Sequence, residues 1–404
     1  MKQKVVLAYS GGLDTTYCAI YLNKELNLDV HAVTIQTGGF SAQELASIKE
    51  RALSLGVASF KVIDVTQQYY TSCIRYLVYG NVLKNATYPL SVSAERMLQA
   101  MTVANYAKET GVEFVAHGST GAGNDQVRFD MIFQSVVPGV KILTPIRDMR
   151  LSREAEIAYL QEYGVHLDFQ KAQYSINKGL WGTSVGGKET LNSNGYLPEE
   201  AWPTPMTAVT PFEIVLYFNE GELTGVNNET NLDPVTAIQK LQAMAQPYGI
   251  GRDIHVGDTI IGIKGRVGFE AAAPLIIIKA HHLLEKHTLT KWQLYWKDQL
   301  STWYGNWLHE GMMLDPTMRN VEKFMLDTQT NVTGKVFVTL HPHRFVITGI
   351  ESPHDLMNNK FGAYGEMNNT WDGDDVKGFA KIFGNQVAIF HTVNGNQKET
   401  VNNG

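Results

Sequence analysis

Lys4-Val-Val-Leu-Ala-Tyr-Ser-Gly-Gly-Leu-Asp-Thr-Thr16 is the stretch that decides the fold. Its apolar run, Val5 to Ala8, predicts a buried parallel strand, and a helix is expected from Asp14 to Lys24 with Asp14 as its cap. Between them, Ser10-Gly11-Gly12 can turn tightly and point successive backbone N–H groups at one place. Because a helix N-terminus lies behind this turn, the stretch predicts a phosphate-binding strand–loop–helix.

Strand and helix patterns alternate from this turn to about residue 145. A helix is expected at Ala42–Leu55, ending at Gly56. Further strands are expected at Val30–Gln36, Ser59–Val65 and Val112–Ala116. The alternation predicts an α/β domain with a parallel sheet covered on both faces, whose ligands lie beyond the carboxyl ends of the strands.

A second glycine turn follows the strand at Val112–Ala116 and reads His117-Gly-Ser-Thr-Gly-Ala-Gly-Asn-Asp-Gln-Val-Arg-Phe-Asp130. Asn124 and Arg128 are four residues apart, so they share a face if a helix begins here. The guanidinium of Arg128 is a rigid fork of donors suited to a carboxylate. Two polar glycine turns on one sheet predict one cleft with two walls.

The pattern changes beyond residue 165 to that of an α+β domain. Residues 174–184 are rich in glycine and hydroxyl groups and predict a binding loop rather than a strand, and the prolines of 197–211 predict an extended connection. The tail after Gly395 is expected to be frayed. The remaining expected elements are hairpins at Phe212–Val226 and Gly334–Gly349, a helix at Pro234–Ala245, a strand at Thr259–Lys264 and a helical region at Ala280–Asp327.

The composition is that of an ordinary globular protein: 404 residues, 44% hydrophobic and 18% charged. The net charge of −6 disfavours a nucleic-acid partner. The apolar run near Met1 is too short for a signal peptide, and the longest apolar segment, 271–278, is too short to cross a bilayer, so no membrane partner is expected. Only two cysteines are present, which suits a reducing compartment, and a cytoplasmic enzyme is expected.

The string Ser10–Thr15 resembles the pyrophosphate-binding loop of the N-type ATP pyrophosphatases, which split ATP between the α- and β-phosphates. It lacks the glycine–lysine pair of a Walker A loop. Together with the second turn and with Tyr174-Ser175, Gly179-Leu-Trp181 and Ser184, its order and spacing closely resemble the argininosuccinate synthase family. That family joins citrulline to aspartate in arginine biosynthesis, using ATP, through a citrullyl-adenylate, with release of AMP and pyrophosphate.

The resemblance implies a doubly wound, HUP-like ATP-binding domain at residues 1–168. It also implies an α+β synthetase domain at 169–365, a C-terminal extension at 366–404, and assembly into a homotetramer. Mg²⁺ is expected on the phosphates of ATP.

Carried over by position, the resemblance also implies the site residues. Asp14 and Asp125 are the candidate catalytic residues, and no residue is assigned to a metal. The ATP contacts are expected at Ala8, Tyr9, Ser10, Gly11, Gly12, Leu13, Asp14, Thr15, Thr16, Ile35 and Gly118. The aspartate contacts are expected at Thr120, Asn124 and Asp125. The citrulline contacts are expected at Tyr88, Ser93, Asn124, Arg128, Ser175 and Ser184.

Some positions depart from the pattern of the family. Thr16 stands where serine is common, and Ala122 where lysine is. Gly257 occupies the position of a glutamate that pairs with the α-ammonium of citrulline, and Phe269 that of a tyrosine whose hydroxyl contacts the same substrate. An unpaired buried ammonium is costly. Either other residues bind it, or the substrate is an N-acylated citrulline such as N-succinylcitrulline; plain citrulline is favoured, because changes elsewhere in a pocket can compensate.

Other candidate features have plainer explanations. The stripe Trp292, Tyr295, Trp296, Trp303 and Trp307 is expected in a core or subunit interface rather than stacked on bases. His281, His282, His341 and His343 lack metal-ligand spacing and are expected to be satisfied or solvent-facing, and Cys18 to be packed. A tRNA-modifying pyrophosphatase would need paired reactive cysteines, and a non-catalytic ATP-binding module would not need the polar set of the second turn.

Overall fold

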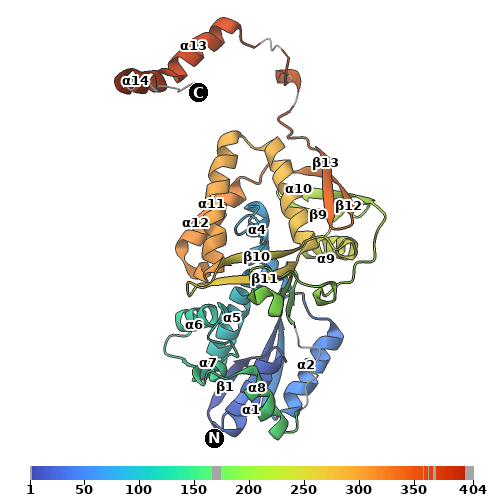
Figure 1. Ribbon diagram of the computed structural model, residues 1–404, viewed down its shortest axis with the longest axis vertical. Coiled ribbons are helices and arrows are strands. Elements are labelled where there is room, and N and C mark those ends of the chain that lie inside the picture. Colours follow the sequence, from blue (N-terminus) through green and yellow to red (C-terminus); the bar gives the residue numbers. More distant parts are fainter. Residues whose placement is uncertain (1, 166–173, 358, 363, 367–369, 396–404) are drawn as a thin grey trace, which may run out of the picture. The chain divides into compact units, whose positions relative to one another are not determined.

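The five-stranded parallel sheet near the N-terminus is the part of the fold that the first glycine turn belongs to (Figure 1). The computed structural model describes residues 2–165, 174–357, 359–362, 364–366 and 370–395. Its contacts divide the chain into one unit ending at His354 and another beginning at Asp355. The predicted boundary at residue 168 lies outside the described residues.

The N-terminal sheet has the strand order β3-β2-β1-β4-β5, and every pair is parallel. Along β1, Val5 and Leu7 pack in one apolar cluster and Val6 in another, so helices cover both faces as predicted. The strands are β1 (Lys4–Ala8), β2 (Asp29–Gln36), β3 (Ser59–Asp64), β4 (Phe114–Ala116) and β5 (Lys141–Leu143). The helices of this part are α1 (Leu13–Lys24), α2 (Ala42–Ser54), α3 (Thr66–Tyr69), α4 (Arg75–Tyr79), α5 (Ser91–Thr110), α6 (Asp125–Val136), α7 (Pro145–Asp148) and α8 (Arg153–Glu162), with a π-helical turn, η1 (Tyr70–Ile74), before α4.

The predicted cap of α1 is wrong. Gly12, in an extended conformation, is the N-cap residue, and no side chain caps the helix there. Asp14 lies in the first turn, where a carboxylate favours the positive end of the helix dipole but does not cap it. The first backbone N–H groups of α1 are therefore left without a side-chain cap.

Two antiparallel sheets make up the rest of the first unit. The order of one is β10-β11-β7-β6 and of the other β13-β12-β8-β9. The hairpins predicted at 212–226 and 334–349 are confirmed. The strands are β6 (Ser175–Gly179), β7 (Gly182–Gly186), β8 (Phe212–Asn219), β9 (Glu222–Val226), β10 (Arg252–Asp258), β11 (Lys264–Glu270), β12 (Gly334–His341) and β13 (Arg344–Glu351).

Two expectations for these sheets are wrong. Residues 174–184 were expected as a loop, but 175–186 form the hairpin β6–β7, in which residues 175–179 pair with 182–186 across the Leu180–Trp181 turn. Residues 259–263, expected as a strand, form the turn between β10 and β11. The hydroxyl of Thr259 closes it, donating to the carbonyl of Ile263 over 2.8 Å and accepting from its N–H over 3.0 Å.

The helical region expected from Ala280 begins earlier and consists of separate helices. They are α10 (Ala272–Thr288), α11 (Lys291–His309) and α12 (Pro316–Asp327), with the short 3-10 turn η6 (Met312–Leu314) between the last two. The helix predicted at 234–245 is confirmed as α9 (Pro234–Ala245). Further 3-10 turns are η3 (Lys188–Leu191), η4 (Glu199–Ala201) and η5 (Gln246–Tyr248). The second unit contains η7 (Asn359–Phe361), α13 (Gly373–Phe383) and α14 (Asn385–Asn394). Among the described residues, no helix is long and apolar enough to cross a membrane.

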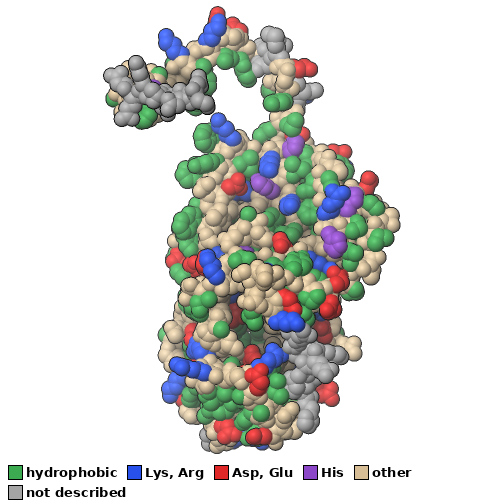
Figure 2. Space-filling model, viewed as in Figure 1, with side chains coloured by type: hydrophobic (Ala, Val, Ile, Leu, Met, Phe, Trp, Pro, Cys, Tyr) green, Lys and Arg blue, Asp and Glu red, His purple; other side chains and the backbone are tan. Residues whose placement is uncertain are grey.

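Most of the aromatic stripe of α11 is exposed, and only Trp307 packs against the core. Trp292, Tyr295, Trp296 and Trp303 each keep more than half of their surface accessible. An interface role for the stripe stays a prediction. On the surface, Lys, Arg, Asp and Glu side chains are interspersed over the described part of the face drawn in Figure 2.

The segment after β2 of the N-terminal sheet, Thr37–Gly39, contacts the β6–β7 hairpin at residues 178–180, backbone against backbone; this contact is called the seam. The N–H of Leu180 donates to the carbonyl of Thr37 over 3.0 Å. A Cβ added to Gly38 would lie 3.0 Å from the Cβ of Leu180, and one added to Gly39 would collide with the carbonyl of Lys178. The two segments therefore approach more closely than any side chain would allow.

A buried charge cluster joins α10 to α11 and accounts for His281. Its ring nitrogens lie 2.7 Å from Asn81 Oδ1 and 2.8 Å from Gln329 Oε1, so the imidazole is satisfied, as expected. Beside it, Lys297 Nζ is 2.9 Å from Glu285 Oε2, and both side chains are fully buried. Burial alone would raise the pKa of Glu285, but His281 and Lys297 hold it below its usual range.

Lys297→Met is expected to lower the free energy of unfolding by about 3–5 kcal/mol, because it leaves the Glu285 carboxylate buried without its cation. Urea unfolding followed by circular dichroism measures this. Lys291→Met, at the exposed start of the same helix, should change it by about 0.5 kcal/mol or less. Equal losses in the two variants would contradict the prediction.

Candidate active site

The two glycine turns lie against each other at the carboxyl ends of β1 and β4, which are neighbours in the sheet. A Cβ added to Gly118 would lie 3.1 Å from the Cβ of Asp14 and 3.2 Å from the backbone nitrogen of Thr15. The second turn thus rests directly on the first turn of α1. The sequence predicted one cleft with two walls, and the structure brings these walls together.

The first turn is held open by its own hydroxyl groups and by one arginine. Gly11 has a φ of +74°, and its carbonyl accepts a hydrogen bond from Arg51 of α2 over 2.5 Å. The hydroxyls of Ser10 and Thr15 are 3.2 Å apart across the loop. The N–H groups of Ser10 and Gly12 donate to the hydroxyls of Thr15 and Ser10, each over 3.4 Å. These contacts fix a glycine loop at a helix N-terminus, which is the arrangement that binds phosphate.

The other residues predicted to contact ATP lie at the same carboxyl edge of the sheet, some buried beneath the loop and some at the ends of β1 and α1. Tyr9, Thr16 and Ile35 are buried, so they form the floor beneath the loop rather than its surface. Ala8 is the last residue of β1, and Leu13 is the first of α1.

The carboxyl of Asp14 is paired with that of Glu156, on α8. Burial, and then the neighbouring Asp14, raises the pKa of Glu156 to about 8, and burial raises that of Asp14. Glu156 is almost fully buried, and its Oε2 has no hydrogen-bond partner among the described residues. Two carboxyls in such a site hold a proton between them, because both cannot ionise at low cost.

This pair predicts a pH-dependent stability. Because the pKa of Glu156 is higher in the folded than in the unfolded chain, the folded protein binds more protons, and the free energy of unfolding falls as pH rises from about 5 to 8, by up to about 1.4 kcal/mol per unit. Denaturant titrations at several pH values should show this fall and its loss in Glu156→Gln. Glu162→Gln, at the exposed end of α8, should keep the wild-type slope. A Glu156→Gln slope equal to that of the wild type would show that the pair does not hold the proton.

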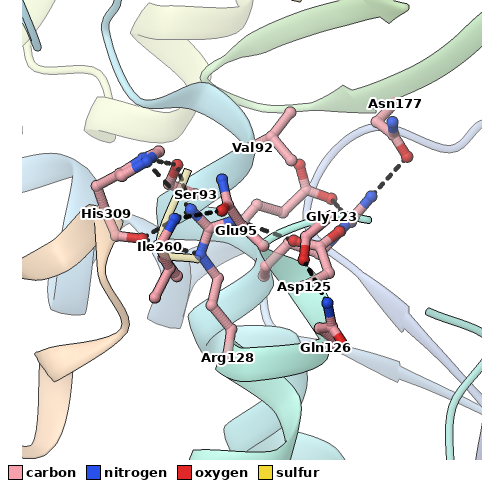
Figure 3. Close-up of polar contacts among 12 residues, drawn as sticks. Val92, Ser93, Glu95, Gly123, Asp125, Gln126, Arg128, Asn177, Ile260 and His309 are labelled. Atoms are coloured by element: carbon pink, nitrogen blue, oxygen red, sulfur yellow. Dashed lines mark hydrogen bonds and ion pairs between the residues drawn. The ribbon is translucent and has the colours of Figure 1, made fainter. Parts of the chain in front are cut away.

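Asp125 is the best-anchored residue of the second turn (Figure 3). Its Oδ2 accepts from Arg96 Nε of α5 over 3.0 Å, and its Oδ1 accepts from Arg128 Nη1 over 2.9 Å. Burial would raise its pKa, but the two guanidinium groups hold it below the usual range. Asp125 is therefore a fixed negative charge, better suited to binding an ammonium than to accepting a proton.

Arg128 ties this carboxylate to the start of α5 and the end of α11. Its Nη2 donates to the hydroxyl of Ser93 over 3.1 Å and to the carbonyl of His309 over 2.7 Å, and its Nε also donates to that carbonyl (Figure 3). Burial, and then Arg128, lowers the pKa of His309 to about 3, so its ring is neutral. The guanidinium of Arg128 was expected to bind a substrate carboxylate, but most of its donors are already hydrogen-bonded to other groups of the protein.

The remaining predicted residues lie around this centre. Asn124 Oδ1 accepts from the N–H of Ile260, in the β10–β11 turn, over 2.8 Å. The Tyr88 hydroxyl accepts from the N–H of Val92 over 3.0 Å, and Ser184 Oγ lies 3.5 Å from Asn177 Nδ2. Ser175 and Thr120 are exposed, at the start of β6 and within the second turn.

Arg96, Gln99 and Asn177 belong to this network but were not predicted from the sequence. Arg96 Nη2 is 2.5 Å from Asn177 Oδ1, and its Nη1 is 2.7 Å from Gln99 Oε1. One signal was present, because Arg96 follows Ser93 by three residues and so lies on the same face of α5.

Two of the positions that depart from the family pattern, Gly257 and Phe269, lie next to the rings of His255 and Tyr88. Phe269 is fully buried, with its ring centroid 5.3 Å from that of Tyr88, and His255 stacks on Tyr88 at 5.1 Å. A Cβ on Gly257 would lie 2.6 Å from His255 Nε2. Burial, and then Lys84, lowers the pKa of His255 to about 4. The place of the missing glutamate is filled by a neutral imidazole.

A parallel sheet with two opposed glycine turns, joined to an antiparallel domain that brings its hairpins to the same edge, defines a nucleotide-binding synthetase of the HUP class. Residues 4–166 match the family described as arginosuccinate synthase N-terminal HUP domain, and residues 174–390 match the arginosuccinate synthase C-terminal domain. The chain belongs to the argininosuccinate synthase family.

Curated relatives agree over nearly the full length. The argininosuccinate synthase of Dictyoglomus thermophilum is 36% identical over 408 residues, covering 98% of this chain and 99% of the relative. That of Methanocaldococcus jannaschii is 34% identical, covering 96% and 98%. That of a Synechococcus species is 35% identical, covering 95% of each.

Proposed function

We propose that this protein joins citrulline to L-aspartate at the expense of ATP and forms argininosuccinate, AMP and pyrophosphate in arginine biosynthesis. The observation that carries the proposal is the contact between the phosphate-type turn at Ser10–Thr15 and the second turn, which bears Asn124, Asp125 and Arg128. Nearly full-length relatives named for this activity support it.

In this reaction the protein mainly has to position the substrates and to neutralise the charge of the phosphates. The ureido oxygen of citrulline attacks the α-phosphorus of ATP, the bond to the bridging oxygen breaks, and pyrophosphate leaves. The amine of aspartate then attacks the ureido carbon, and AMP leaves with the ureido oxygen. We assign the backbone N–H groups of the first turn to the phosphates, and the fixed charge of Asp125 to the amino end of aspartate.

The individual site roles remain proposals. We propose Ala8–Thr16, Ile35 and Gly118 for ATP, Thr120, Asn124 and Asp125 for aspartate, and Tyr88, Ser93, Asn124, Arg128, Ser175 and Ser184 for citrulline. Asp14 stays a candidate catalytic residue, although its pairing with Glu156 favours a structural one. We also propose domain boundaries near 168 and 365.

Mg²⁺ is proposed to arrive on the nucleotide, neutralising its phosphates. Mg²⁺ bound to a nucleotide is held largely by phosphate oxygens and water. Among the described residues there is no group of three or more His, Cys, Asp or Glu side chains that could hold a metal ion. We propose a homotetramer in the cytoplasm. Cys18 and Cys73 are free and buried, which suits a reducing compartment.

We retain free citrulline as the ureido substrate, because the relatives are named for argininosuccinate, the product of unacylated citrulline. The test is pyrophosphate release from ATP. It should require a ureido amino acid, and argininosuccinate should appear only when aspartate is added. Cleavage of ATP without a ureido compound would overturn the proposal. Parallel assays with N-acetyl- and N-succinylcitrulline should give a kcat/KM well below that for citrulline.

A further inference from the structure

Glu95 is a buried acid that the proposed reaction does not use. It lies on α5 between Ser93 and Arg96, and only 3% of its surface is exposed. Its Oε1 accepts from the hydroxyl of Thr37 over 3.0 Å and from Gln99 Nε2 over 2.6 Å. Its Oε2 has no hydrogen-bond partner among the described residues. The side chain is thus half satisfied, which is unusual for a buried carboxyl.

Its position links the two halves of the candidate site. Thr37 follows β2, on the nucleotide side, and is bonded through its carbonyl to Leu180 of the hairpin seam. The unpartnered Oε2 lies directly against Gly179 of β6, where an added Cβ would collide with it. Arg96 Nη1 is 3.6 Å from Glu95 Oε1, and the same guanidinium holds Asp125 and Asn177 on the aspartate side.

Burial favours the neutral form of Glu95, and the neighbouring charge of Arg96 opposes it. Burial raises the pKa of Glu95 to about 7, Asp125 of α6 adds to the rise, and Arg96, Thr37 and Gln99 oppose it. Tyr69 of α3 and Tyr88, before α5, also face it, and both remain uncharged, because burial raises their pKa values. Seam residues Asn177 and Gly179 of β6 bring no charge.

We propose that Glu95 is a positioning residue that aligns the Thr37 wall of the nucleotide site with the Arg96–Asp125 pair, and that its protonated form is the aligned one. This inference rests on the proposed function. When Glu95 is neutral, Gln99 lies between it and Arg96, and the guanidinium is free to hold Asp125 and Asn177. When it ionises, the carboxylate competes for Arg96, and the hold on Asp125 weakens. Because Glu95 is enclosed beneath the seam, it acts through these neighbours and does not touch substrate.

The test compares the pH profile of kcat/KM for aspartate between the wild-type protein and Glu95→Gln, from pH 6 to 8.5. The amide keeps an acceptor for Thr37 and cannot ionise. The two proteins should be within about twofold at pH 6, and the variant should exceed the wild type by about three- to tenfold at pH 8.5, the size expected for a small misalignment. Glu95→Ala, which removes the acceptor, should lose kcat at every pH while remaining folded.

Glu322→Gln is the matched control, because it removes another buried acid, on α12, that bonds Tyr304 and Arg319 instead of site residues. Its profile should be parallel to that of the wild type. A Glu95→Gln profile that is also parallel would overturn the inference. The wild-type assay alone tests the proposed function, which fails if pyrophosphate release does not require citrulline. Calorimetric titration of aspartate over the same pH range measures the effect of Glu95 on aspartate binding without turnover.

Discussion

Arg128→Met is expected to lower kcat/KM by at least about 100-fold and the free energy of unfolding by about 3–5 kcal/mol, because it breaks a buried network at its centre. Without the guanidinium, the carbonyl of His309 loses its donor, and Asp125 depends on Arg96 alone. The second turn would then lose its attachment to α11. Steady-state kinetics and urea unfolding measure the two effects separately.

Arg128→Lys is the informative companion. It keeps one positive charge but cannot reach Ser93, Asp125 and the carbonyl of His309 together, since an ammonium lacks the planar fork. Its activity should lie between those of the methionine variant and the wild type. If lysine restored full activity, charge alone would matter, and the geometric account of this network would be wrong.

Gly118→Ala should reduce kcat/KM for ATP by about 100-fold while costing only about 1–3 kcal/mol of stability. Gly118 does not need a left-handed conformation, so close approach alone decides the outcome. The new methyl group would lie 3.1 Å from Asp14 and force the second turn away from the first turn of α1. The KM for ATP should rise more than that for citrulline.

Gly123→Ala is the matched control within the same turn. Apart from its two neighbours in the chain, no described residue has an atom within 4 Å of the Cβ that this substitution would add, so the kinetics should stay within about twofold of the wild type. A similar loss in both variants would mean that any alanine disturbs the turn, and that contact with α1 is not the cause.

The N-terminal sheet could be predicted because its signal is local. Continuous apolar runs such as Val5–Ala8 separated by helical stretches allow few arrangements, and glycine after a strand marks its carboxyl end. The β6–β7 hairpin was missed because most residues of its two strands are small or polar and give no clear strand pattern. The sheet that holds the hairpin is completed by β11, which pairs with β7 and lies far away in the sequence.

The site residues that lie in the two glycine turns could be predicted from the sequence, whereas those that lie within helix α5 could not. Ser10–Thr15 and Asn124–Arg128 stand out because loops rarely need so many polar groups. Glu95 and Arg96 look in the sequence like ordinary residues on the solvent side of a helix. Only the packing of α5 beneath the hairpin seam and against α6 shows that they are enclosed and paired.

The seam between Gly38-Gly39 and Lys178-Gly179 also constrains how this chain can diverge. Gly38 and Gly39 cannot gain a methyl group unless the backbone of residues 178–180 retreats, and Gly179 cannot gain one unless Glu95 moves. A change on the nucleotide side of the seam must therefore be answered in the hairpin. We expect sequences descended from this one to change the two segments together or not at all. Recombination that exchanged the nucleotide-type half alone between distant relatives should then fail at this contact first, before any residue that meets a substrate is mismatched.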